Sequence, residues 1–153
     1  MKTKLWVCWI ILTALALTGA GLFIYLQPHP QPIPTEAAFK AAVIPNDMLN
    51  VADPKRGELI SHGCLACHNL GAGEKNKIGP NLFGVVGRGI ATKEGFEYSP
   101  AFTALQGRTW TTDELYEFFR DPAVFAPGTK MTFGGLGDPQ DRMDLIAFLM
   151  TLR

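Results

Sequence analysis

Five consecutive residues, Cys64-Leu65-Ala66-Cys67-His68, constrain this chain more than any other part of its sequence. Two thiols three positions apart, with a histidine directly after the second, form the pattern for covalent attachment of a c-type haem. Each thiol can add to one vinyl group of the haem, and the imidazole can bind the iron. The motif therefore predicts that Cys64 and Cys67 hold the ring and that His68 is the proximal ligand of the iron.

Three other interpretations of these five residues are weaker. A structural zinc site usually needs four close ligands, often from a second Cys-x-x-Cys pair, and the remaining cysteine, Cys8, lies in a strongly apolar stretch. A thioredoxin-like redox pair would need a βαβ setting, and no neighbouring segment resembles a buried parallel strand. A chance arrangement of two cysteines and a histidine is the third alternative.

The length and charge of the chain limit the number of domains and the classes of partner to expect. The 153 residues leave room for one ordinary domain and an appendage. The 14 Lys and Arg residues balance the 14 Asp and Glu residues, so the overall charge gives no reason to expect a nucleic-acid partner. Two of the three cysteines lie in the haem motif, so a disulfide framework is not expected.

The N-terminal region is predicted to contact a lipid bilayer. Residues 5–26 carry no formal charge, and as a helix these 22 residues would cross a hydrocarbon core of about 30 Å. Lys2 and Lys4 precede the stretch and favour a cytoplasmic location for residues 1–4. A cleaved signal peptide is the alternative, but its apolar region is typically about 7–15 residues long. We expect a single-pass anchor in the inner (cytoplasmic) membrane, with the haem domain on the periplasmic side.

A proline-rich linker follows at residues 27–50. Its prolines alternate at positions 28, 30, 32 and 34, which favours a polyproline II conformation and a semi-rigid spacer. Residues 51–153 then form the haem domain.

Helix starts are easy to recognise within residues 51–153. Asp53-Pro54 and Asp138-Pro139 each combine an N-cap residue with proline at the first helical position. Thr111 and Glu114 form a capping box, and Pro122 is expected to end the helix that starts there. Residues 70–96 are rich in glycine and lack periodicity, so we expect a loop packed on the haem. Apolar residues follow the later two starts at helical spacing: Leu115, Phe118 and Phe119, then Leu145, Phe148, Leu149 and Leu152.

A second protein ligand to the iron would have to come from residues 69–153, where no histidine lies. Of the methionines there, Met143 and Met150 lie in the predicted terminal helix, where a packing role is expected. Met131 follows the turn Pro127-Gly128-Thr129-Lys130 and could be held against a ring. Histidine and methionine together would fill both axial positions, which favours electron transfer over catalysis at the iron. The chain is therefore not expected to be an enzyme.

From Asp53 to Arg153 the sequence resembles a class I cytochrome c of the mitochondrial and bacterial c2 type. The resemblance implies an all-α fold around one covalent haem c, with the first and last helices crossed near Gly57 and Phe148. It implies His68 and Met131 as the axial ligands. The residues that carry it are CLACH at 64–68, GPNL at 79–82, FG at 83–84, GR at 87–88, TW at 109–110, PGTKM at 127–131 and DLIAFL at 144–149.

The resemblance also assigns supporting roles around the haem. The carbonyl group of Pro80 is expected to accept a hydrogen bond from the outer nitrogen of His68, which fixes the tautomer of the imidazole. The positions that hydrogen-bond the haem propionates in this family are matched here by Arg88, Tyr98, Trp110 and Thr129.

Three residues depart from the family pattern, of which Ser61 stands near the first helix where bacterial relatives often carry phenylalanine. Phe118 stands where many relatives carry a tyrosine whose hydroxyl group reaches the methionine sulfur. Phe102 stands where relatives often carry a smaller or polar residue. The change at Phe118 removes a hydrogen-bond partner of the methionine sulfur, and the change at Phe102 argues against the internal water that is found in some relatives.

The charge of the haem domain bears on its partners. From Val51 onward there are 11 Lys and Arg residues and 12 Asp and Glu residues, whereas the soluble mitochondrial protein is strongly basic around its haem edge. A tethered carrier needs less electrostatic steering, because its anchor raises its effective concentration. We therefore expect a membrane-anchored electron carrier between a cytochrome bc1-type donor and a cytochrome c oxidase-type acceptor. A fixed haem subunit of a larger complex and a peroxidase or gas-binding cytochrome are the alternatives.

Overall fold

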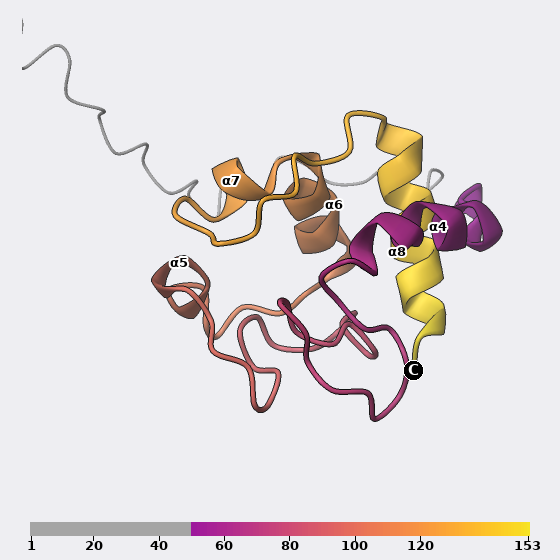
Figure 1. Cartoon of the computed structure of the whole chain (residues 1–153). Helices are drawn as coiled ribbons and strands as arrows, with labels where there is room; N and C mark the ends of the chain where they lie inside the picture. The colour runs from indigo at the N-terminus through magenta and orange to yellow at the C-terminus, as the bar shows by residue number, and fades with distance from the viewer. Residues whose placement is uncertain (1–49) are drawn as a thin grey trace, which may run out of the picture. The chain divides into compact units, whose positions relative to one another are not determined.

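The computed structural model describes residues 50–153, which comprise the predicted haem domain and the last residue of the predicted linker. The predicted anchor at residues 5–26 and the linker up to residue 49 lie outside the described residues. Within residues 50–153, no helix is both long and apolar enough to span a membrane. The described chain consists of helices and long loops (Figure 1), with an isolated β-bridge between Gly89 and Thr109. The predicted all-α fold is therefore confirmed.

The described helices are short, apart from the last one. They are α4 (Pro54–Ser61), the 3-10 turn η1 (His62–Cys64), α5 (Pro100–Thr103), α6 (Thr112–Arg120), α7 (Pro122–Phe125) and α8 (Pro139–Thr151). No helix is present between η1 and α5, which confirms the predicted loop over residues 70–96.

The helix starts follow the local sequence. The carboxylates of Asp53 and Asp138 cap α4 and α8 by accepting hydrogen bonds from backbone N–H groups at 2.9 and 2.8 Å. The hydroxyl oxygen of Thr111 caps α6 by accepting from the backbone N–H of Glu114 at 3.1 Å. The Glu114 carboxylate pairs with Arg108, with 3.3 Å between Nε and Oε1.

The helix that starts at Thr111 ends before Pro122, as predicted, and Pro122 has a second role that was not predicted. Helix α6 ends at Arg120, and Pro122 is the first residue of a further short helix, α7. Asp121 makes this possible, because its carboxylate accepts hydrogen bonds from the N–H groups of Ala123 and Val124 at 3.0 and 3.1 Å. Proline is favourable at the first position of a capped helix, where its missing N–H group has no intrahelical partner to lose.

Helices α4 and α8 cross in direct contact, although they lie at opposite ends of the described residues (Figure 1). A Cβ atom at Gly57 would lie 1.9 Å from the carbonyl oxygen of Asp144 and 2.8 Å from the Cβ atom of Phe148. The predicted crossing near Gly57 and Phe148 is confirmed. Because η1 follows α4 directly, this crossing also fixes where the chain enters the cysteine motif.

A buried carboxylate stabilises the same crossing. Asp144 is only 1 % exposed, and its Oδ1 atom accepts hydrogen bonds from the backbone N–H of Asp53 and from Gln140 Nε2, both at 2.8 Å. Its Oδ2 atom accepts from Arg56 Nη1 at 2.6 Å, and Arg56 also pairs with Asp141. Burial acts to raise the pKa of Asp144, but the hydrogen bonds and the charge of Arg56 outweigh it and hold the pKa below its usual value.

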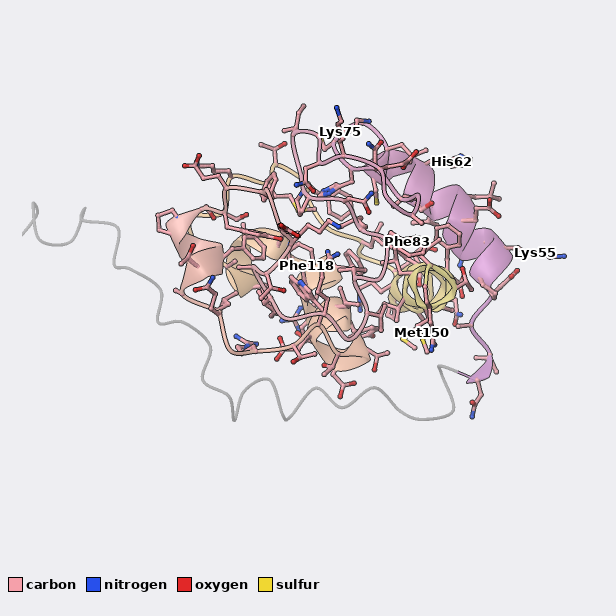
Figure 2. All side chains as sticks on the ribbon, turned by 90° about the horizontal axis from the view of Figure 1, so that it is seen from below. Lys55, His62, Lys75, Phe83, Phe118 and Met150 are labelled. Atoms are coloured by element: carbon pink, nitrogen blue, oxygen red, sulfur yellow. The ribbon has the colours of Figure 1, made fainter. Side chains whose placement is uncertain are left out.

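Aromatic rings form much of the core next to α6. The ring centroids of Trp110 and Phe118 lie 5.0 Å apart, and those of Trp110 and Phe125 lie 5.6 Å apart in a stacked arrangement. Phe102 meets Phe118 edge to face at 5.9 Å. Figure 2 shows Phe118 among the interior side chains. The apolar face predicted for α6 is therefore buried.

The substitution Gly57→Ala is expected to lower the free energy of unfolding by at least about 3 kcal/mol, because the added methyl group would overlap the backbone of α8. Gly137→Ala is the matched control, since a Cβ atom there meets no atom within 4 Å and should change stability by less than about 0.5 kcal/mol. Chemical denaturation measures both values. Equal stabilities for the two variants would contradict the close crossing.

The substitution Asp144→Asn should lower stability at pH 7 by about 2 kcal/mol, because it weakens charge-assisted hydrogen bonds in a buried position. The folded-state pKa of Asp144 lies below its unfolded value, so its stabilising contribution is complete above the unfolded pKa of about 3.9 and is lost as the pH falls through the folded value. The difference between wild type and variant should therefore shrink on acidification below about pH 4.

The control for this series is Asp141→Asn, because the Asp141 side chain is 28 % exposed and pairs with the same arginine. We expect it to cost less than about 1 kcal/mol. Denaturant titrations at a series of pH values test both variants, and a cost for Asp144→Asn that stays constant down to pH 3 would count against the assigned role.

Candidate haem-binding site

A cavity of about 440 Å³ lies between the cysteine motif, the long loops and helices α6 and α8. This volume falls within the range of about 300–1,000 Å³ that is usual for cofactor and ligand sites. All nine residues that the sequence assigned to the haem site line it: Cys64, Cys67, His68, Pro80, Arg88, Tyr98, Trp110, Thr129 and Met131.

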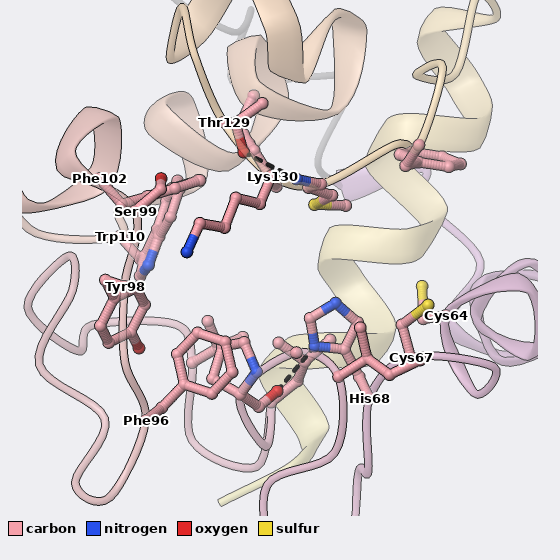
Figure 3. Close-up of a pocket in the computed structure, with 18 of the residues that line it drawn as sticks. Cys64, Cys67, His68, Phe96, Tyr98, Ser99, Phe102, Trp110, Thr129 and Lys130 are labelled. Atoms are coloured by element: carbon pink, nitrogen blue, oxygen red, sulfur yellow. Dashed lines mark hydrogen bonds between the residues drawn. The ribbon is translucent and has the colours of Figure 1, made fainter.

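The cysteine motif forms one tight helical turn. The backbone N–H groups of Cys67 and His68 both donate to the carbonyl oxygen of Cys64, at 3.0 and 2.8 Å. Both thiols are free and half-buried, and Figure 3 shows them beside His68 at the wall of the cavity. Burial, and to a lesser extent the neighbouring Cys67, raises the pKa of the Cys64 thiol. The turn thus presents two thiols and an imidazole to the same cavity.

The imidazole of His68 is buried and held in one orientation. Its Nδ1 atom lies 2.7 Å from the carbonyl oxygen of Pro80, which can only accept, so Nδ1 carries the proton (Figure 3). The Nε2 atom is then the unprotonated nitrogen that a metal ion requires. Burial lowers the pKa of His68 and outweighs the hydrogen bond to Pro80, which acts in the opposite direction. The side chain is therefore neutral at neutral pH, as a metal ligand must be.

The loop that carries Pro80 is fixed by a residue whose role the sequence analysis missed. Asn81 is 1 % exposed, and its amide nitrogen donates to the carbonyl oxygens of Gly71 and Glu74, each at 2.9 Å. The carbonyl oxygen of Asn81 accepts from Arg88 Nη2 at 3.1 Å. The position of asparagine directly after proline was the available signal, but its partners lie seven and ten residues away.

Polar groups gather in one part of the cavity. Figure 3 shows Tyr98, Ser99 and Trp110 close together, and Arg88 also lines the cavity. Burial raises the pKa of Tyr98 and lowers that of Arg88. The Ser99 hydroxyl is buried and has no hydrogen-bond partner among the described residues. An unpaired buried hydroxyl in the cavity wall fits the carboxylate groups of a haem, and sequence reasoning had not selected Ser99.

Thr129 and Lys130 lie across the cavity from His68 (Figure 3). The hydroxyl oxygen of Thr129 accepts a hydrogen bond from the backbone N–H of Met131 at 3.1 Å, which fixes the start of the Met131 segment. The Lys130 side chain extends into the cavity in Figure 3, and its flexible four-carbon stem allows it to turn towards solvent when a haem is bound. Met131 therefore lines the same cavity as His68 from the segment on the opposite side.

The residues present fit a covalent haem better than a metal ion alone. Among residues 50–153, no group of three or more His, Cys, Asp or Glu side chains could hold a metal ion. The cavity instead combines two free thiols, a neutral imidazole, a thioether and a polar corner within mainly apolar walls. These are the groups that attachment, axial ligation and propionate binding require.

The substitution Gly79→Ala should displace His68, because a Cβ atom at Gly79 would lie 2.2 Å from the imidazole Cε1 atom. We expect a changed visible spectrum and binding of carbon monoxide by the reduced protein. Gly63→Ala is the control, since Gly63 lines the same cavity but an added Cβ atom meets nothing within 4 Å. If Gly79→Ala behaves like Gly63→Ala, the proposed position of the imidazole is wrong.

Comparison with known proteins places these features in a family. No family model matches the chain. Among curated proteins, a cytochrome c homolog of Rickettsia felis is 38 % identical over 137 residues, covering 90 % of this chain and 78 % of the relative. Cytochrome c of Stellaria longipes is 50 % identical over 98 residues, covering 63 % of this chain and 90 % of the relative.

Further matches include cytochrome c2 of Blastochloris viridis, which is 47 % identical over 97 residues and covers 63 % of this chain and 76 % of the relative. Among solved structures, cytochrome cH from Methylobacterium extorquens is 40 % identical with a TM-score of 0.61, covering 65 % of this chain and 99 % of that one. The chain therefore belongs to the class I cytochromes c of the mitochondrial and c2 type, single-haem electron carriers rather than enzymes, and binds haem c covalently through Cys64 and Cys67.

Proposed function

We propose that this chain is a membrane-anchored carrier that moves single electrons from a cytochrome bc1-type donor to a cytochrome c oxidase-type acceptor. The observation that carries the proposal is the cavity, where His68, fixed by Pro80, and Met131, on the facing segment, line the same space. With both axial positions of the iron occupied by side chains, no position is open to a substrate.

The residues at the site have different roles. Cys64 and Cys67 attach the ring, and His68 and Met131 supply one nitrogen and one sulfur ligand. The bound haem supplies an iron that alternates between the ferric and ferrous states. We infer that the propionate groups are held by Arg88, Tyr98, Trp110 and Thr129, together with Ser99, because all five residues line the cavity.

The walls of the cavity favour the reduced state. Leu115, Phe118 and Leu149 line it, and all three are buried. Apolar surroundings disfavour the more highly charged ferric site, and a thioether ligand acts in the same direction. Phe118 brings no hydroxyl group to this wall, so the sulfur of Met131 gains no hydrogen bond from that position.

The membrane anchor is part of the proposal. The uncharged stretch at residues 5–26 and the lysines before it support a single-pass anchor in the inner membrane, with the haem domain in the periplasm. The Rickettsia felis relative aligns over 137 residues, so its similarity extends beyond the 103 residues of the haem domain. The nearly balanced charge of the domain also suits a tethered carrier, which needs little electrostatic steering.

Optical spectra of the full-length protein, purified in detergent from carbonate-washed membranes, test the proposal. We expect a c-type spectrum when reduced, a far-red sulfur-to-iron band when oxidised and no shift with carbon monoxide. Met131→Ala should lose the far-red band and bind carbon monoxide, whereas the control Met150→Ala should do neither. Recovery of the protein in the wash contradicts the anchor, and carbon monoxide binding by the wild type contradicts the closed iron site.

A further inference from the structure

Arg142 on α8 has a charged side chain that is buried without an acidic partner. The residue is only 5 % exposed. Within residues 50–153 it takes part in no ion pair, and its Nε atom has no hydrogen-bond partner there. A buried guanidinium without a carboxylate costs stability unless other contacts compensate for its lost hydration. The contacts that Arg142 does make therefore indicate its role.

The guanidinium of Arg142 contacts neutral groups from two parts of the chain. Its Nη1 atom donates hydrogen bonds to the carbonyl oxygens of Leu136 and Gly137, at 2.6 and 3.1 Å. Its Nη2 atom donates to the hydroxyl oxygen of Tyr116 on α6 at 3.0 Å, and its Cζ atom lies 4.4 Å from the centre of the Tyr116 ring. Charged donors form strong hydrogen bonds, and the face of an aromatic ring attracts a cation. Arg142 thus links residues 136–137 to α6.

Leu136 and Gly137 lie at the end of the segment between α7 and α8 that carries Met131 (Figure 1). Near its start, the backbone N–H of Thr129 donates to the carbonyl oxygen of Ala126 at 2.9 Å. In the described part of the chain, no hydrogen bond involves residues 132–135. The position of this stretch therefore depends on the packing of Phe133 against the core and on the contacts at its two ends.

Two further contacts hold the end of this segment against α6. The backbone N–H of Leu136 donates to the carbonyl oxygen of Phe119 at 2.7 Å. Gly135 has a φ of +87°, and a Cβ atom there would lie 2.3 Å from the carbonyl oxygen of Arg120. The backbone of the segment thus passes directly against that of α6. Because Met131 lies only a few residues before this contact, a shift of the contact would also move the thioether.

We propose that Arg142 is a positioning residue for Met131: its guanidinium, stacked on Tyr116, holds the end of the segment so that the thioether keeps its place on the iron against competing ligands. This inference rests on the proposed function, in which Met131 is an axial ligand. Arg142 itself does not line the haem cavity. Its planar fork suits the role, because it donates to Leu136, Gly137 and Tyr116 at once.

Displacement of Met131 by imidazole, measured on the full-length protein in detergent, tests the proposal. Imidazole replaces the thioether on the ferric iron without a change of oxidation state, and loss of the far-red band reports the exchange. Arg142→Met keeps an unbranched side chain but removes the donors. We expect it to bind imidazole about tenfold or more tightly than the wild type, because charged hydrogen bonds no longer hold the segment.

Hydrogen exchange supplies a second measurement that needs no added ligand. The N–H of Leu136 is protected by its bond to Phe119 and exchanges only when the segment opens. In Arg142→Met, its exchange should accelerate by about the same factor as the affinity for imidazole rises.

Asp144→Asn is the control for a general loss of stability. The carboxylate of Asp144 bonds to Asp53, Arg56 and Gln140, none of which belongs to the Met131 segment. Its affinity for imidazole should stay within about twofold of the wild type, since distant sites act independently. Arg142→Lys keeps the charge but not the fork, and its affinity should be about threefold above the wild type. This variant decides the matter if Arg142→Met does not fold.

A pair of glycine variants tests the same contact without changing Arg142. Gly135→Ala places a methyl group against the Arg120 carbonyl and should raise the affinity for imidazole about fivefold or more. Gly134→Ala is the matched control, because a Cβ atom at Gly134 meets nothing within 4 Å. Its affinity should equal that of the wild type.

The outcomes separate this inference from the proposed function. If the wild type shows the far-red band but the two Arg142 variants bind imidazole as the wild type does, the positioning role is overturned and the proposed function stands. Equal affinities for Gly135→Ala and Gly134→Ala, or an effect of Asp144→Asn as large as that of Arg142→Met, overturn the role as well. If the wild type has no far-red band, Met131 is not an axial ligand, and both proposals fail.

Discussion

The hydrogen bond from His68 Nδ1 to the carbonyl oxygen of Pro80 is the interaction on which the redox site depends. It settles which nitrogen of the imidazole is protonated and which is left for the iron. The bond requires a loop without secondary structure to hold one carbonyl group in place. Asn81 achieves this by donating to two distant carbonyl groups of the same loop, and Gly79 leaves room for the ring. The loop that carries Pro80 is thus held in one conformation although it contains no helix or strand.

The second constraint is the crossing of α4 and α8. The motif begins where α4 continues into η1, so the direction of α4 determines where the two thiols point. Gly57 allows the backbones of the two helices to come into contact. The carboxylate of Asp144 accepts a hydrogen bond from the backbone N–H of Asp53, directly before α4. The site on the loops is therefore positioned by the contact between the first and last helices of the described domain.

Short-range chemistry was predictable from the sequence, and long-range pairing was not. The starts of α4, α6 and α8 follow from caps and prolines whose partners lie within three residues. The haem motif is equally local. The role of Asp144 depends on Asp53 and Arg56, which are 91 and 88 residues away, and no periodicity records such a pair. For the same reason Ser99 was missed, since its significance arises only when the fold buries its hydroxyl group.

The arrangement at the start of α4 has a mechanical consequence. The chain that leads from the proposed anchor joins the described domain at residue 50, directly before this helix. A pull on that chain would load the bond from the Asp53 N–H to Asp144 and the packing of Gly57 first. The loops that hold Pro80 and Met131 lie further along the chain and would bear none of this tension until the crossing gave way. In the proposed anchored protein, the end of the domain that carries the tension would therefore be separate from the part that carries the electron.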